Sequence, residues 1–149
     1  MRLFETITDL GQGERALRRR RYGVIETARG RLIGVHLRPW PKRVSHFEAR
    51  WLGGRFHRLS GDDRCFVYYN QPLGHSRFLA LTYAVSGSGC TLATLHAAAG
   101  ALDAVARIKQ SDAALCHVTS GRISDRLLAR FGWSPHCLSS RGRHFIKRY

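Results

Sequence analysis

Short apolar runs and one long amphipathic segment alternate along the second half of the chain. Residues 65–70 (CFVYYN) and 77–85 (RFLALTYAV) are rich in β-forming side chains and flank a turn at 71–74, which predicts two antiparallel strands. Residues 91–109 carry apolar positions at steps of three and four, which predicts a helix. The apolar stripe of this helix consists of Leu92, Leu95, Ala99, Leu102, Val105 and Ile108.

Three shorter elements are predicted after the long helix. Residues 113–119 (AALCHVT) are typical of a short buried strand. Ser120 is a suitable N-cap for a helix over residues 122–131, which would end at Gly132. Residues 144–149 (HFIKRY) have the alternation of a final strand.

The first third has a less regular pattern. Residues 5–21 could hold a helix with Asp9 as its cap. Residues 22–27 and 31–38 read as strands, and the turn-forming residues 28–30 between them favour a hairpin.

Taken in order, these elements predict an α/β fold. Its mixed sheet would be antiparallel first and parallel around the long helix, with helices flanking the sheet. The length of 149 residues fits a single domain, with a divergent part over 1–62 and a second part over 63–149. Residues 42–61 are ambiguous, and 44–52 within them could form a helix or a strand.

The net charge narrows the possible partners. The chain has 25 Lys and Arg against 10 Asp and Glu, a formal charge of +15, which favours anionic partners such as nucleic acid or a ribosome. An arginine-rich proteome would produce the same balance without a functional meaning. A phosphate-binding edge is predicted at one uninterrupted run, namely Arg18, Arg19, Arg20 and Arg21.

Other classes of protein are disfavoured. The apolar stretches are too short to span a membrane, and we expect a cytoplasmic protein because no secretory h-region is visible. The cysteines at 65, 90, 116 and 137 show no C-x-x-C spacing, so we expect free thiols and no metal.

A glycine-rich turn, Ser86–Gly89, separates the long apolar strand from the long helix. Such a junction exposes backbone N–H groups at the positive end of a helix dipole, where phosphate binds readily. The turn lacks the lysine of a P-loop and the third glycine of a dinucleotide fingerprint. A plain strand-to-helix turn is the alternative interpretation.

Residues 64–149 resemble the GCN5-related N-acetyltransferase (GNAT) superfamily, which runs strand, pyrophosphate loop, long helix, strand, short helix and final strands. Residues 127–133 (LLARFGW) lie where that family has L-Y-x-x-x-G-F, and 143–149 (RHFIKRY) resemble its last strand. The resemblance implies acetyl-CoA as co-substrate. The implied pyrophosphate loop, Q/R-x-x-G-x-G/A, falls on Ser86, Gly87, Ser88, Gly89, Cys90 and Thr91. Leu128 replaces the family's proton-donating tyrosine.

Acyl transfer to an amine also needs a general base. The candidates are Tyr83 on the long strand and His117 on the strand after the helix, with His136, Glu26 and Glu48 as further possibilities. We therefore predict an acyl-CoA-dependent N-acetyltransferase with an unidentified amine acceptor. The alternative is a non-catalytic basic module that binds nucleic acid or a ribosome on a degenerate acetyltransferase scaffold.

Overall fold

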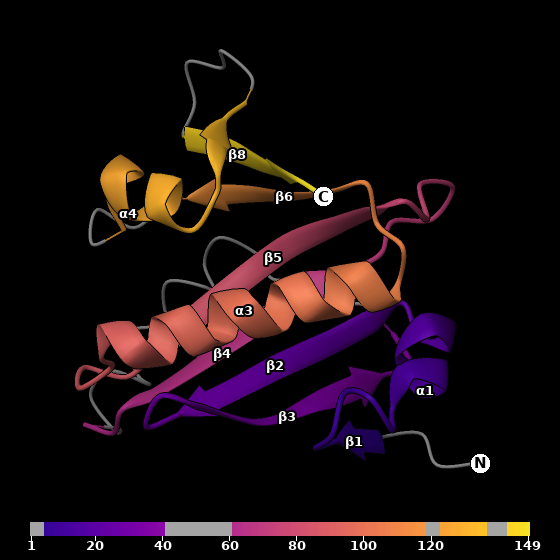
Figure 1. The fold of residues 1–149 in the computed structure, drawn as a ribbon, viewed down its shortest axis with the longest axis horizontal. Coiled ribbons are helices and arrows are strands. Elements are labelled where there is room, and N and C mark those ends of the chain that lie inside the picture. Colours follow the sequence, from indigo (N-terminus) through magenta and orange to yellow (C-terminus); the bar gives the residue numbers. More distant parts are fainter. Residues whose placement is uncertain (1–4, 41–60, 119–122, 137–142) are drawn as a thin grey trace.

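An eight-stranded mixed sheet forms the centre of the described chain (Figure 1). The computed structural model describes residues 5–40, 61–118, 123–136 and 143–149. The strands are β1 (Glu5–Ile7), β2 (Tyr22–Ala28), β3 (Arg31–Arg38), β4 (Arg64–Asn70), β5 (Phe78–Ser86), β6 (Ala113–Val118), β7 (Ser134–Pro135) and β8 (Arg143–Arg148). The helices are α1 (Glu14–Arg19), α3 (Leu92–Ile108) and α4 (Asp125–Arg130).

The strand order is β1-β3-β2-β4-β5-β6-β8-β7. Neighbouring strands are antiparallel except β5 and β6, which are parallel and are joined through α3. The predicted α/β class and mixed sheet are therefore confirmed. The element order that the resemblance implies is also observed, from β5 through the glycine turn to α3, β6, α4 and the final strands.

The predicted hairpin forms between β2 and β3. Its central residues, Arg29 and Gly30, have φ of 51° and 74°, and positive φ at both positions is what a type I′ turn requires. Glycine adopts this conformation at no steric cost, whereas Arg29 holds it under mild strain. The turn brings Arg29 and Gly30 to the end of the sheet where α3 begins.

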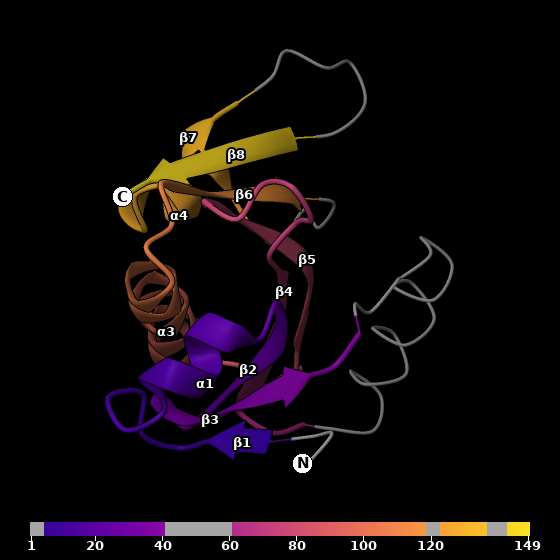
Figure 2. The ribbon, with the colours of Figure 1, turned by 90° about the vertical axis from the view of Figure 1, so that its right-hand side faces the viewer.

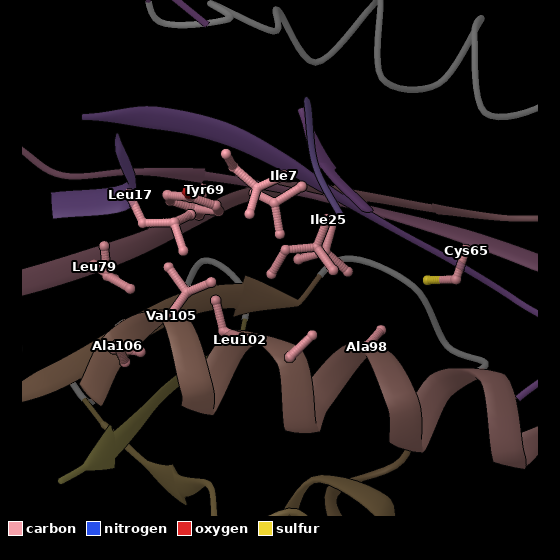
Figure 3. Packing of buried hydrophobic residues seen from close by; sticks show 14 of the residues in the cluster. Ile7, Leu17, Ile25, Cys65, Tyr69, Leu79, Ala98, Leu102, Val105 and Ala106 are labelled. Carbon is pink, nitrogen blue, oxygen red and sulfur yellow. The ribbon is translucent and has the colours of Figure 1, made fainter. Parts of the chain in front are cut away.

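Helix α3 covers one face of the sheet, and α1 lies on the same face (Figure 2). The buried side of α3 includes Ala98, Leu102 and Val105, which pack against Ile25, Tyr69 and other sheet residues (Figure 3). Small alanine side chains let the helix axis approach the strands closely. The predicted stripe is wrong at its first position, because Leu92 is 54% exposed.

Two sequence predictions in this region are corrected by the structure. Residues 5–21 do not form one helix: β1 comes first, and α1 begins after Gly13. Gly11 and Gly13 disfavour a helix through this segment, and Gly13 packs so closely on Ile7 of β1 that a side chain there would collide with it. Asp9 accepts a hydrogen bond from the Gln12 backbone amide instead of capping a helix.

The short helix near the carboxyl end is also displaced from its prediction. Its N-cap is Ser124, whose hydroxyl accepts from the Leu127 amide, and the helix starts at Asp125. Gly132 ends it with φ of 87°, as predicted. Ser120 and the ambiguous stretch 44–52 lie outside the described residues.

Candidate functional site

The glycine turn is held by backbone hydrogen bonds to β4. The Gly87 amide donates to the Arg64 carbonyl oxygen at 2.9 Å, and the Cys90 amide donates to the Gly87 carbonyl at 3.1 Å. Gly89 lies against the segment before β4, and a Cβ there would collide with the carbonyl oxygen of Gly61. Glycine is therefore required at position 89 by packing within this chain.

Asp63 occupies part of the N-terminal end of α3. Its carboxylate accepts a hydrogen bond from the Thr91 amide at 2.7 Å and contacts the Thr91 hydroxyl at 3.0 and 3.1 Å. The pKa of the Asp63 carboxyl is lowered by hydrogen bonds from the Thr94 side chain and the Thr91 backbone, with a further contribution from the charge of Arg29. An internal carboxylate thus already uses one of the donors at this helix end.

Several amides of the turn and first helical turn remain open. Within the described ranges, no hydrogen-bond acceptor is found for the amides of Ser88, Gly89, Leu92 and Ala93. Ser88, Gly89 and the first helical residues are also exposed. These groups can donate to an oxyanion that approaches beside Asp63.

The parallel strands β5 and β6 pair only over part of their length. Pairing joins Phe78–Leu81 to Ala113–Cys116 and stops there. The register of β5 against β4 shifts at Thr82, because Tyr68 faces Tyr83 while Tyr69 faces Leu81. Figure 1 shows the two strands diverging toward the start of α3. The edge of β5 over residues 82–86 therefore has no β6 partner and leads directly into the glycine turn.

The structure places the two predicted catalytic residues on either side of this divergence. Tyr83 lies on β5 next to the register shift, and His117 lies on β6 directly after the last paired residue. The exposed imidazole of His117 stacks on that of His144 with ring centroids 4.4 Å apart. His136 is also exposed, and its amide donates to the carbonyl of His144 on β8 at 2.8 Å. Their catalytic role stays a prediction.

Leu128 belongs to the hydrophobic core. It is 7% exposed and packs in the main cluster with Trp133. The carbonyl of Leu128 accepts from the amides of Phe131 and Trp133, which closes the end of α4. The side chain at this position is thus a packing group without a proton to donate.

A polar network on the other face of the sheet was only partly foreseen. His36 Nε2 lies 2.7 Å from Glu26 Oε2, and the Thr6 hydroxyl lies 3.0 Å from His36 Nδ1. Arg64 Nε is 3.8 Å from Glu26 Oε1. Glu26 is a candidate from the sequence alone, whereas the other members of the network come from β1, β3 and β4 and are identified only by the structure. Glu48 lies outside the described residues.

The arginine run does not form one uniform edge. Arg18 and Arg19 lie in the last turn of α1, while Arg20 caps the helix and Arg21 precedes β2. Arg18 Nε donates to the Ile108 carbonyl at 2.9 Å. Part of the run therefore fastens α1 to the end of α3, and its predicted role in nucleic-acid binding stays a prediction.

Thiols and metals add little to the site. Cys65, Cys90 and Cys116 are free thiols. Burial raises the pKa of Cys65 to about 12 and that of Cys116 to about 11, which leaves both unreactive as nucleophiles near neutral pH. Among the described residues, no three His, Cys, Asp or Glu side chains are grouped to hold a metal ion. None of the helices described is long and apolar enough to cross a membrane.

No protein-family model matches the chain, and no curated protein sequence matches it. A crystal structure of nourseothricin acetyltransferase is similar over 99% of both chains, with a TM-score of 0.36 and 15% sequence identity.

Proposed function

We propose that this protein is an acyl-CoA-dependent N-acyltransferase that moves an acetyl group from acetyl-CoA to an amine. The observation that supports it is the edge of β5 at residues 82–86, which has no partner strand among the described residues and leads into the open amides of Ser88 and Gly89. The pantetheine arm of CoA is extended and carries amides, so it can pair with such an edge as an added strand. The pyrophosphate then meets the turn and the Leu92 and Ala93 amides.

The proposed reaction takes place where β5 and β6 diverge. The amine nitrogen attacks the thioester carbonyl carbon, a C–N bond forms, and the C–S bond breaks to release the CoA thiolate. We assign His117 as the group that accepts the amine proton, with Tyr83 as the alternative on the facing strand. Because Leu128 is apolar, the thiolate takes its proton from solvent. We therefore expect slower transfer than with a positioned acid.

The charge of the protein bears on the acceptor. With a net charge of +15, the surface repels polyamines and strongly cationic peptides. A neutral or acidic amine acceptor is therefore favoured.

Calorimetric titration with acetyl-CoA tests the binding step, on protein freed of nucleic acid in high salt. CoA and ATP serve as controls for general anion binding. The decisive pair of variants is Leu92→Glu and Leu92→Gln, because position 92 is exposed at the start of α3. A glutamate there suits the helix dipole and preserves folding, but it repels a pyrophosphate.

We expect saturable binding that prefers acetyl-CoA over ATP. Leu92→Glu should weaken this binding about tenfold, and Leu92→Gln should leave it within about twofold. Equal binding of all polyanions, or equal effects of the two variants, would refute the proposed site. Turnover of an amine by wild-type protein that His117→Ala leaves unchanged would refute the assignment of His117.

A further inference from the structure

A second anion-attracting surface lies at the same end of the sheet, on the β2–β3 hairpin. A pocket of about 570 Å³ is lined by Ala28, Arg29, Arg31, Ile33, Asp62, Asp63 and Arg64. Its three arginines come from three separate places: the hairpin turn, the first residue of β3 and the first residue of β4. Arg29 and Arg64 are more than 30 positions apart in the sequence, and the sheet brings them together.

The guanidinium groups of this pocket have unused donors. Within the described ranges, Arg31 forms no ion pair or hydrogen bond through its side chain, and Arg29 has only an electrostatic interaction with Asp63. Arg64 Nε is buried without a hydrogen-bond partner, and Glu26 Oε1 lies beyond hydrogen-bond range at 3.8 Å. Buried or clustered guanidinium groups are costly unless an acceptor is supplied.

The anchoring of the hairpin makes this arrangement rigid. The Arg29 amide donates to the Asp63 carbonyl at 3.0 Å, and the Gly30 amide donates to the buried Thr94 hydroxyl at 2.9 Å. Arg29 keeps its positive φ because both neighbouring segments hold it. The backbone of the hairpin turn is therefore held in place by α3 and the segment before β4 before any ligand arrives.

We propose that this pocket binds a phosphate monoester carried on a small organic molecule. Three guanidinium forks match the three terminal oxygens and the nearly double charge of a phosphate monoester better than they match a carboxylate. Ala28 and Ile33 offer apolar surface to the organic part, and the volume is within the range of small-molecule sites. Asp62 and Asp63 in the lining both oppose the ligand, and Asp62 is the one whose side chain does not hold the start of α3. This inference is independent of acyl transfer, because its donors are side chains of the hairpin and β4.

Calorimetric titration with adenosine monophosphate, inorganic phosphate and adenosine tests the proposal. Arg31→Gln removes one exposed cation from the pocket, and Asp62→Asn removes the opposing charge. Arg15→Gln is the matched control, because it removes one exposed arginine from α1 at the opposite end of the molecule (Figure 1). Thermal unfolding of each variant confirms that folding is preserved.

We expect both phosphates to bind and adenosine not to bind. Arg31→Gln should weaken phosphate binding about tenfold or more, Asp62→Asn should strengthen it about threefold, and Arg15→Gln should change it less than twofold. Equal losses in Arg31→Gln and Arg15→Gln would show general attraction of anions to surface cations and overturn the proposal. A second result would also overturn the proposal: adenosine monophosphate does not bind, whereas RNA without a terminal phosphate binds and depends on Arg31.

Discussion

Thr94 connects the hairpin pocket to the start of α3, and its removal gives a quantitative test of that connection. The side chain is fully buried, and its hydroxyl accepts a hydrogen bond from the Gly30 amide at 2.9 Å. Thr94→Val keeps the volume but leaves this amide without an acceptor. The Gly30 amide is part-buried, and the variant also removes the hydrogen bond from Thr94 to Asp63. Together these losses cost about 1–3 kcal/mol, and valine adds no cavity. We expect the free energy of unfolding, measured by urea titration, to fall by that amount.

Thr27→Val is the matched control for this prediction. Thr27 is equally buried, and its hydroxyl donates to the Thr94 carbonyl at 3.1 Å. That carbonyl lies inside α3 and keeps its helical partner when Thr27 is changed, so no group loses its last hydrogen bond. The expected loss is about 0.5–1 kcal/mol. Equal losses in the two variants, or a loss below about 0.5 kcal/mol for Thr94→Val, would refute the reasoning.

Two further predictions concern pH and packing. Burial, helped by the charge of Arg21, lowers the pKa of Lys109 from 10.5 to about 8, so the unfolded chain holds this proton more tightly. The contribution of Lys109 to the free energy of unfolding should therefore rise between about pH 8 and pH 10.5, by at most about 3 kcal/mol. Urea titration measures it as the difference between wild type and Lys109→Met, because the raised pKa values of Cys65 and Cys116 lower the stability of both proteins above about pH 9. Gly89→Ala should lower the unfolding free energy by about 1–3 kcal/mol because its Cβ meets the Gly61 carbonyl. Gly100→Ala, in open space on α3, should raise it by up to about 1 kcal/mol in the same assay, and equal shifts would contradict this contrast.

Elements with a strong local pattern could be predicted from the sequence. Alternating β-forming residues located β2, β3, β4 and β5 to within one residue at each end. The start of α3 followed from Thr91 after the glycine turn, and Thr91 is its N-cap. Such features depend on neighbouring residues, and so do the type I′ turn at Arg29–Gly30 and the end of α4 at Gly132.

Features that depend on distant residues could not be predicted in this way. Nothing near Thr91 in the sequence shows that Asp63, 28 positions earlier, accepts its amide hydrogen bond. The pairing of Glu26 with His36 needs the hairpin register, which shifts at a bulge. The exposure of Leu92 also depends on distant residues, namely those of the sheet. The sheet selects a face of α3 rich in alanine, whereas periodicity favours the larger side chains.

Asp63 lies between the two binding surfaces that we propose at the charged end of the molecule. On one side are the open amides of the glycine turn and α3, and on the other are the arginines of the hairpin pocket. The carboxylate bonds to Thr91 and also faces the charge of Arg29, so it reduces the attraction of either surface for an anion. A phosphate that neutralises the arginines would also weaken the electrostatic attraction between Arg29 and Asp63. We therefore expect ligands on the two surfaces to influence each other through Asp63. Leu92 variants should act directly on the surface of the turn and α3, and Arg31 variants directly on the hairpin pocket.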